Sequence, residues 1–181
     1  MRIISGTHKG RRLQAPKNLP VRPTTDNAKE ALFNILNNSY YFNELKVLDL
    51  FAGTGNISFE FASRGTPSIL CVDAHFGCIK FIHKTAQELK MPIRTIKKDV
   101  FSYLLSTSEA FDIIFADPPY HFEVDQFELI VQTVFDRSLL KLEGVLIIEH
   151  PKQTDLSQTE NYSESRRYGG SVFSFFRVSE G

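Results

Sequence analysis

The most informative part of the sequence is residues 46–55, which read Lys46-Val47-Leu48-Asp49-Leu50-Phe51-Ala52-Gly53-Thr54-Gly55. Residues 46–51 form an apolar run with the length of a buried β-strand, and helical spacing of apolar residues begins at Ile57. Gly53 and Gly55 lack a Cβ, so the backbone between these two elements can turn tightly and come close to a bound ligand. The stretch therefore predicts a strand, a glycine turn and a helix, the unit from which open α/β sheets are built.

Strand-like and helix-like segments alternate downstream of this unit. Apolar runs of strand length lie at residues 69–73, 93–97, 112–117 and 145–149. Apolar residues with the spacing of one helix face lie between the strands, and these are Ile57 and Phe61; Ile79, Ile82, Ala86 and Leu89; and Phe127, Ile130, Val131 and Val134. Because repeated strand–helix units build a mostly parallel sheet, we expect helices on both faces of that sheet.

Both ends of the chain add an element to this core. Upstream, Thr24 or Thr25 can cap a helix, whose apolar face is Ala28, Ala31, Leu32, Ile35 and Leu36. Downstream, residues 166–168 and 171–177 flank Gly169-Gly170, a turn signal that predicts an antiparallel hairpin at the sheet edge. The polar residues 153–165 are expected to form a mobile surface loop. The prediction is thus one α/β domain over residues 1–181 with a mostly parallel seven-stranded sheet, and residues 1–23 form a basic N-terminal extension.

Composition excludes several classes of protein. The chain has 181 residues, of which 42% are hydrophobic and 23% charged, as in an ordinary globular domain. No apolar run approaches the roughly 20 residues that span a bilayer, and residues 1–6 lack the apolar stretch of a secretory signal. We therefore expect no membrane association and a cytoplasmic location. Cys71 and Cys78 have no metal-binding spacing, so we expect two buried free thiols.

Charge is distributed unevenly along the chain although it balances overall. The 21 basic and 21 acidic side chains cancel, yet residues 1–30 carry +5 and the remainder −5. Lys and Arg side chains that neutralise phosphates release counterions, which gives a protein sequence-independent affinity for nucleic acid. We therefore expect the extension to contact RNA or DNA through Arg2, Lys9, Arg11 and Arg12. A solvated extension without a partner is the alternative.

Acidic side chains occur at the ends of three predicted strands, where open α/β sheets bind their ligands. A carboxylate at Asp49 repels the pyrophosphate of a dinucleotide, but it attracts the ammonium and sulfonium groups of S-adenosylmethionine. Ser58 also replaces the third glycine of the dinucleotide fingerprint. Asp73 can accept hydrogen bonds from ribose hydroxyls. Asp99 can meet an adenine amine, and a loop cap is its alternative role.

The most specific motif in the chain is Asp117-Pro118-Pro119-Tyr120, at the end of the fourth predicted strand. The exocyclic amine of a base is a poor nucleophile because its lone pair is delocalised into the ring. A carboxylate at Asp117 and the carbonyl of Pro118 can both accept its hydrogens, turn the lone pair toward a methyl donor and stabilise the charge that develops on nitrogen. Tyr120 offers a flat face on which an extruded base can stack. The motif therefore predicts methylation of a base amine.

The sequence resembles the 16S rRNA guanine-N2 methyltransferase D family (RsmD-like) over nearly its whole length. The segments that carry the resemblance are residues 1–6 with Lys9-Gly10-Arg11, Arg22-Pro23-Thr24-Thr25-Asp26, residues 29–34, residues 47–55, Ser63-Arg64-Gly65, Asp117-Pro118-Pro119-Tyr120 and residues 169–172. The Arg-Pro-Thr-Thr-Asp segment is more particular to the family than the Asp-Pro-Pro-Tyr motif, which many amino methyltransferases share. The resemblance implies a Rossmann-like class I methyltransferase sheet, S-adenosyl-L-methionine as methyl donor, and the N2 amine of one guanine in 16S rRNA, within the assembling 30S subunit, as acceptor.

The resemblance also implies roles for individual residues. The amino-acid end of the cofactor is held by Asp49, Gly53 and Gly55, its ribose by Asp73 and its adenine by Asp99, with Thr25 beside its carboxylate. The guanine is received by Asp117, Pro118 and Tyr120. The chain departs from the family pattern at Asp73, where a Glu is usual, and at Thr85, where an Asn is common. The shorter acid still reaches a ribose.

Two other functions stay open from the sequence. An N6-adenine DNA methyltransferase could use the same Asp-Pro-Pro-Tyr chemistry, although such enzymes usually need extra sequence to read their target. A non-catalytic RNA-binding assembly factor could keep the fold alone. The five histidines show no metal-binding spacing and no interface stripe is evident, so we expect no metal and a monomer.

Overall fold

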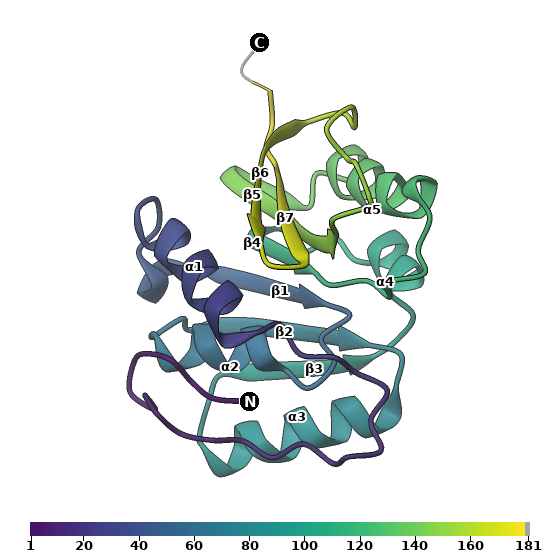
Figure 1. Cartoon of the computed structure of the whole chain (residues 1–181). Coiled ribbons are helices and arrows are strands. Elements are labelled where there is room, and N and C mark those ends of the chain that lie inside the picture. Colours follow the sequence, from purple (N-terminus) through teal and green to yellow (C-terminus); the bar gives the residue numbers. More distant parts are fainter. Residues whose placement is uncertain (180–181) are drawn as a thin grey trace.

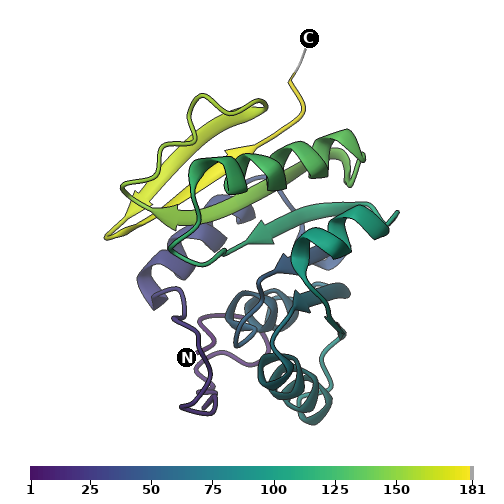
Figure 2. The same cartoon turned by 90° about the vertical axis from the view of Figure 1, so that its right-hand side faces the viewer.

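The computed structural model describes residues 1–179, which form a seven-stranded sheet with helices on both faces (Figures 1 and 2). Residues 180 and 181, the end of the predicted domain, lie outside the described range. The elements in chain order are α1 (Asp26–Asn37), the 3₁₀ turn η1 (Phe42–Glu44), β1 (Lys46–Leu50), α2 (Asn56–Ser63), β2 (Ser68–Asp73), α3 (Phe76–Glu88), β3 (Ile93–Lys97), α4 (Val100–Ser106), β4 (Phe111–Ala116), α5 (Val124–Asp136), β5 (Leu140–Pro151), β6 (Tyr162–Tyr168) and β7 (Ser171–Phe176).

The strand order β3-β2-β1-β4-β5-β7-β6 positions the functional loops. β1 is parallel to β2 on one side and to β4 on the other, with Leu50 opposite Ala116. The chain therefore reverses its winding direction between β1 and β4, and a crevice opens at the carboxyl ends of these strands. β7 is antiparallel to β5, and β6 is the edge strand. This confirms the predicted α/β sheet and its C-terminal hairpin.

Two apolar layers sandwich the sheet because strand side chains point alternately to its two faces. Helices α1, α2 and α3 pack on the face that carries Val47 and Phe115. Helices α4 and α5 pack on the face that carries Leu48 and Ile114. Asp49 lies two residues after Val47, so its side chain belongs to the α1–α3 side.

Three local predictions differ from the structure. Helix α4 was not predicted, because its two turns are too short to show a helical period. β5 begins at Leu140 instead of residue 145. The predicted loop 153–165 ends at Asn161, because residues 162–165 are the start of β6 and pair with β7. Their polarity reflects an edge strand with one solvated face.

Two other sequence predictions, the cap of α1 and the state of the cysteines, are confirmed. Thr25 is the N-cap of α1, and its side chain accepts a hydrogen bond from the backbone N–H of Ala28. Cys71 and Cys78 are buried free thiols. Within residues 1–179, no helix is both long and apolar enough to cross a membrane.

The N-terminal residues 1–13 form a small hairpin that packs on the body of the protein. Arg2 pairs with Arg12 in an antiparallel bridge, and Ile3 and Leu13 are buried in the α1–α3 layer. The hairpin docks on α2, where the Glu60 carboxylate accepts hydrogen bonds from the backbone N–H groups of Ile4 at 2.7 Å and Ser5 at 3.1 Å. The extension is therefore part of the folded structure, at least over this hairpin.

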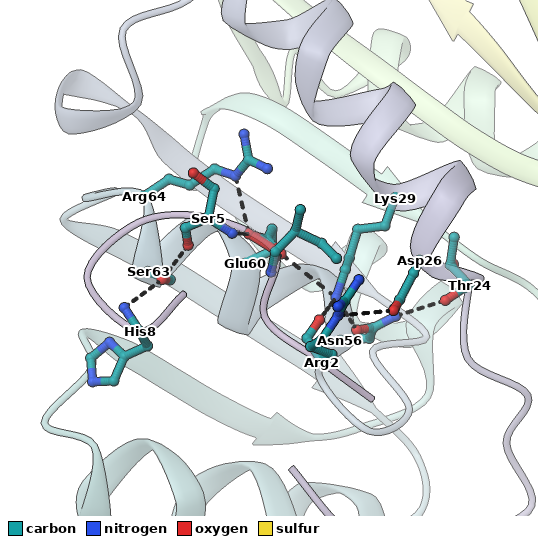
Figure 3. Close-up of polar contacts among 11 residues, drawn as sticks. Arg2, Ser5, His8, Thr24, Asp26, Lys29, Asn56, Glu60, Ser63 and Arg64 are labelled. Atoms are coloured by element: carbon teal, nitrogen blue, oxygen red, sulfur yellow. Dashed lines mark hydrogen bonds and ion pairs between the residues drawn. The ribbon is translucent and has the colours of Figure 1, made fainter. Parts of the chain in front are cut away.

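A buried ion pair holds this attachment together (Figure 3). The Lys29 and Glu60 side chains are 1% and 0% exposed, and Lys29 Nζ lies 3.6 Å from Glu60 Oε1. Lys29 also donates to the carbonyl of Arg2 at 2.5 Å and to Asn56 Oδ1 at 2.7 Å. Burial lowers the pKa of Lys29, and the nearby Glu60 carboxylate opposes that shift. Lys29 thus contributes to the +5 charge of residues 1–30 without being available to an external partner.

Breaking this pair should destabilise the protein far more than removing a surface charge. Lys29→Met or Glu60→Gln alone should each lower the free energy of unfolding by about 3 kcal/mol, because each removes one member of a buried ion pair and leaves the other member buried. The double variant should cost less than the sum of the two, since neither charge then remains buried. Urea unfolding of the four proteins measures this coupling. Arg166→Gln, in an exposed ion pair of β6, is the matched control and should change stability by no more than about 0.5 kcal/mol. A Lys29→Met protein as stable as the wild type would contradict the argument.

Candidate functional site

A cavity of about 550 Å³ opens at the carboxyl ends of β1, β2 and β4. Five segments line it: residues 20–24 before α1, 49–57 after β1, 73–78 after β2, 99–100 after β3, and 115–122 after β4. Its volume is within the range of small-molecule sites. The structure brings most of the predicted site residues to this one cavity, namely Asp49, Gly53, Asp73, Asp99, Asp117, Pro118 and Tyr120.

The glycine turn connects β1 to α2 with two left-handed residues. Gly53 has φ +58° and Gly55, the N-cap of α2, has φ +79°. Gly53 lines the cavity, and its N–H donates to Asp73 Oδ2 at 2.9 Å. A Cβ on Gly55 would lie 2.9 Å from both Ile82 and Phe59. Gly55 does not line the cavity and instead lets α2 pack closely on α3.

Asp49 is a buried carboxylate at the floor of the cavity, 2% exposed. Its Oδ2 accepts a hydrogen bond from Ser58 Oγ at 2.7 Å, and Cys71 Sγ donates to the same hydroxyl at 3.0 Å. Burial raises the pKa of Asp49 to about 7. No basic side chain of residues 1–179 forms an ion pair with it. This acid is therefore suited to a cationic ligand group, which would replace the missing partner.

Asp73 and Asp99, two further acids of the cavity, already accept hydrogen bonds within the protein. Asp73 accepts from Gly53 through Oδ2 and from the backbone N–H of His75 through Oδ1 at 2.8 Å. Asp99 caps α4 by accepting from the Ser102 N–H at 2.9 Å. Because a carboxylate has about four acceptor positions, both acids can still accept ligand hydroxyl or amine hydrogens. Asp99 combines the capping role with a place in the cavity wall.

The Asp117-Pro118-Pro119-Tyr120 motif follows β4. Within residues 1–179, the Asp117 carboxylate receives no hydrogen bond from a protein donor. Burial raises the pKa of Asp117, and the negative charges of Glu149 and Asp49 raise it further. The Pro119 carbonyl accepts from the Phe122 N–H at 3.1 Å, whereas no described backbone N–H donates to the Pro118 carbonyl. A free carboxylate and a free carbonyl thus stand side by side at the cavity.

Tyr120 completes the motif with an exposed aromatic face. Its ring is half exposed, and the Arg22 guanidinium lies 5.6 Å from the ring centroid. Arg22 belongs to the segment 20–24, which forms one wall of the cavity. The segment before α1 therefore contacts the strand-end motif directly.

The site in the structure differs from the sequence prediction at two positions. Thr25 is exposed and caps α1, so it is not a lining residue; its neighbour Thr24 lines the cavity and donates to Glu149 Oε2 at 2.5 Å. Glu149, two residues before the end of β5, is 3% exposed and was missed as a functional candidate. The signal was present, because Glu149 is another acid at a strand end beside the switch in winding direction.

The basic residues proposed for nucleic-acid contact lie outside the cavity. Lys9, Arg11 and Arg12 are exposed on the N-terminal hairpin, and Arg2 forms an ion pair with Asp26 at 3.2 Å. Residues 14–19 connect this hairpin to the cavity wall at 20–24. In the described part of the chain, no group of three or more His, Cys, Asp or Glu side chains could hold a metal ion.

Comparisons with known proteins match nearly the whole chain. Residues 1–177 match the family model described as Conserved hypothetical protein 95. The Haemophilus influenzae protein named ribosomal RNA small subunit methyltransferase D is 30% identical over 168 residues, which cover 90% of this chain and 85% of that protein. The Escherichia coli K12 protein of the same name is 29% identical over 157 residues, covering 86% of this chain and 77% of that one.

Two solved structures show the same fold. A hypothetical protein of Thermus thermophilus has a TM-score of 0.85 at 24% identity, with 98% of this chain and 99% of that chain covered. The T. thermophilus 16S rRNA N2 G1207 methyltransferase, solved with AdoMet and guanosine, has a TM-score of 0.70 at 19% identity, with 88% and 45% covered. At these identities the likeness concerns the fold alone.

The buried carboxylate at the cavity floor should make the stability of the ligand-free protein depend on pH. The folded pKa of Asp49 lies above its ordinary value, so its contribution to stability is complete at low pH and is lost as the pH rises through about 7. Asp49→Asn removes this loss, and its free energy of unfolding should rise relative to the wild type by roughly 2–3 kcal/mol between pH 5 and 8. Urea unfolding across that range measures the difference. Asp125→Asn, on the exposed surface of α5, is the control that should follow the wild type; parallel profiles for Asp49→Asn and wild type would contradict the assignment.

Proposed function

This chain belongs to the family described as Conserved hypothetical protein 95, and on that premise we propose that it methylates ribosomal RNA with S-adenosyl-L-methionine as the methyl donor. The finer proposal is that the acceptor is the N2 amine of one guanine in 16S rRNA. The substrate is the RNA within the assembling 30S subunit, and the enzyme acts as a monomer in the cytoplasm. The observation that carries the proposal is the placement of Asp49, the glycine turn and Asp117 in one cavity.

The donor set of the cavity fits S-adenosyl-L-methionine. Asp49, which lacks a cationic partner among the described residues, would bind the ammonium group, and Gly53 leaves room for close approach of the amino-acid end. Asp73 would accept hydrogen bonds from the ribose hydroxyls and Asp99 from the adenine amine. Gly55 would support this site from behind by packing α2 on α3. When bound, the cofactor supplies a methyl carbon on positively charged sulfur.

The residues after β4 would hold the acceptor. Asp117 and the Pro118 carbonyl both lack protein donors in the described range, so both are free to accept the two hydrogens of an exocyclic amine. Their two acceptor oxygens would orient the nitrogen lone pair toward the methyl carbon and stabilise the positive charge that develops on nitrogen. Tyr120 would stack on the base once the Arg22 guanidinium gives way to it. Because guanine N2 lies in the minor groove of a paired base, the enzyme needs an unpaired or flipped nucleotide.

The test of this proposal is methyl transfer from labelled S-adenosyl-L-methionine to three acceptors: duplex DNA, naked 16S rRNA and 30S particles lacking the modification. We expect label in 16S rRNA, and mass spectrometry of its nucleosides should identify N2-methylguanosine at one position. Label in DNA as N6-methyladenine would instead support a DNA methyltransferase. Failure to bind S-adenosyl-L-methionine would support a non-catalytic assembly factor.

A single substitution in the acceptor site should separate chemistry from binding. Asp117→Ala should lower turnover about a hundredfold or more, because it removes one of the two acceptors of the amine hydrogens. Its affinity for S-adenosyl-L-methionine, measured by calorimetry, should stay close to that of the wild type. Near-normal turnover by this variant would contradict the assignment of the acceptor site.

The exposed charges of the N-terminal hairpin should contribute to RNA binding through phosphates. Replacing Lys9, Arg11 and Arg12 by Ala should weaken RNA binding and reduce the slope of log affinity against log salt by about 0.7–0.9 per lost contact. Affinity for S-adenosyl-L-methionine should not change, because none of the three lines the cavity. Lys141→Ala, on β5 and outside the hairpin, is the control. An unaltered salt slope in the triple variant would count against this interface.

A further inference from the structure

Strand register brings a second acid beside Asp117. β4 and β5 are parallel, with Phe115 opposite Ile147 and Ala116 opposite Ile148. The next pair in the same register is Asp117 and Glu149, on adjacent strands about 4.8 Å apart in backbone spacing. Side chains of residues in register point to the same face of a sheet, so both carboxylates lie on the α1–α3 side. Asp49 on β1 shares this face.

Glu149 is buried behind the cavity wall and is held by the Thr24 hydroxyl. It is 3% exposed and does not line the cavity, whereas Thr24 and Asp117 do. The Thr24 hydroxyl donates to Glu149 Oε2 at 2.5 Å. No Lys, Arg or His in residues 1–179 forms an ion pair with Glu149. Burying an acid without a cation costs several kcal/mol, a cost that packing with a nonpolar residue would avoid.

We propose that Glu149 is a positioning residue for the methyl transfer and acts through Asp117. Its carboxylate, held by Thr24, keeps a negative charge beside Asp117 and so makes Asp117 the acceptor of the proton that the substrate amine loses. The inference rests on the function proposed above and adds to it the fate of that proton.

The hydrogen bonds decide which member of the pair carries the charge. The Thr24 hydroxyl favours the ionised form of Glu149, and it opposes the effect of burial, which raises the pKa of Glu149. Asp117 receives no such donor in the described structure. Besides burial, the charges that face Asp117 are Glu149 from β5 and Asp49 from β1, and both raise its pKa. Of these two neighbouring carboxylates, Asp117 is therefore the one that binds a proton first, and it is the one placed to take the proton that the substrate amine releases.

A basic Asp117 serves the reaction after the new bond has formed. The amine nitrogen uses its lone pair to bond to the methyl carbon, and the electron pair of the broken carbon–sulfur bond stays on sulfur. The nitrogen then carries a positive charge and an N–H directed at Asp117. That proton passes to the Asp117 carboxylate, which leaves a neutral methylamine and a protonated acid that later releases the proton to water. A nearby negative charge at Glu149 favours this transfer.

The test compares Glu149→Gln, which removes the charge, with Glu149→Asp, which keeps it. Carbon-13 NMR of the Asp117 carboxyl carbon in the ligand-free protein measures its titration without any turnover. In Glu149→Gln the Asp117 titration should move to lower pH by about one unit, because a like charge is gone. The acidic limb of kcat for rRNA methylation should move in the same direction, while KM for S-adenosyl-L-methionine stays unchanged. Glu149→Asp should keep the wild-type positions of both.

A second pair of variants keeps the test decisive if Glu149→Gln does not fold. Thr24→Val removes the hydroxyl donor to Glu149 and should shift the Asp117 titration in the same direction by a smaller amount. Thr24→Ser retains the hydroxyl and should leave the titration at its wild-type position. A titration of Asp117 that is equal in the wild type and in both Glu149→Gln and Thr24→Val overturns the role of Glu149, even in an active enzyme. A wild type that transfers no methyl group to rRNA overturns the proposed function instead, and a shifted titration then still establishes the coupling of the two acids.

Discussion

The site depends on the position of β4 between β1 and β5 in a parallel sheet. Hydrogen bonding in this register sets Leu50 opposite Ala116 and Ala116 opposite Ile148. The loops that follow β1 and β4 therefore begin side by side at one edge of the sheet, and the reversal of winding direction between them opens a cavity. A shift of β4 by one residue would turn Asp117 to the opposite face and away from Asp49. Asp49 and Asp117 lie on the same face of the sheet only because the hydrogen bonds between these strands fix the register.

The segment before α1 closes the cavity, and its attachment is mostly polar. Residues 20–24 form one wall, with Arg22 over Tyr120 and Thr24 bonded to Glu149. Asn56 links this wall to the buried Lys29, donating to the Thr24 carbonyl at 3.0 Å while accepting from Lys29. The network in Figure 3 thus ties the N-terminal hairpin, α1, α2 and the cavity wall into one unit.

The site concentrates negative charge that the fold alone does not require. Asp49, Asp117 and Glu149 are all acids whose pKa burial raises, and they lie on one face of three adjacent strands. Such an arrangement lowers the stability of the ligand-free protein, because ionisation of buried acids opposes folding. A cationic cofactor, and a substrate amine that becomes positively charged, would offset this loss of stability. The cost in stability is therefore consistent with a site shaped for positive charge on the ligand side.

Much of the architecture follows from local pattern. The apolar runs and the glycine turn predicted the five parallel strands, and the Gly169-Gly170 turn predicted the hairpin. Both kinds of signal are visible in the sequence because strand period and turn chemistry are properties of neighbouring residues. The same pattern located Asp49, Asp73, Asp99 and Asp117 at strand ends. Helix α4 was not predicted because its two turns show too little periodicity. Residues 162–165 were predicted as a loop because an edge strand with one solvated face has the polar composition of a loop.

The roles of Lys29, Thr24 and Glu149 were decided only by tertiary structure. From the sequence, Lys29 is one more basic residue near the N-terminus, and its place beside Glu60 depends on the docking of α1 on α2. Thr24 and Thr25 are equivalent as candidate caps until the direction of the chain into α1 points one outward and the other at Glu149. By itself, then, the sequence determined the strand–helix order, the turns and the acids at the strand ends. Only the tertiary structure decided which acids lie side by side and which charge is buried. These outcomes depend on contacts between residues far apart in the chain, such as Thr24 and Glu149, which are separated by 125 positions. No local periodicity in the sequence indicates such contacts.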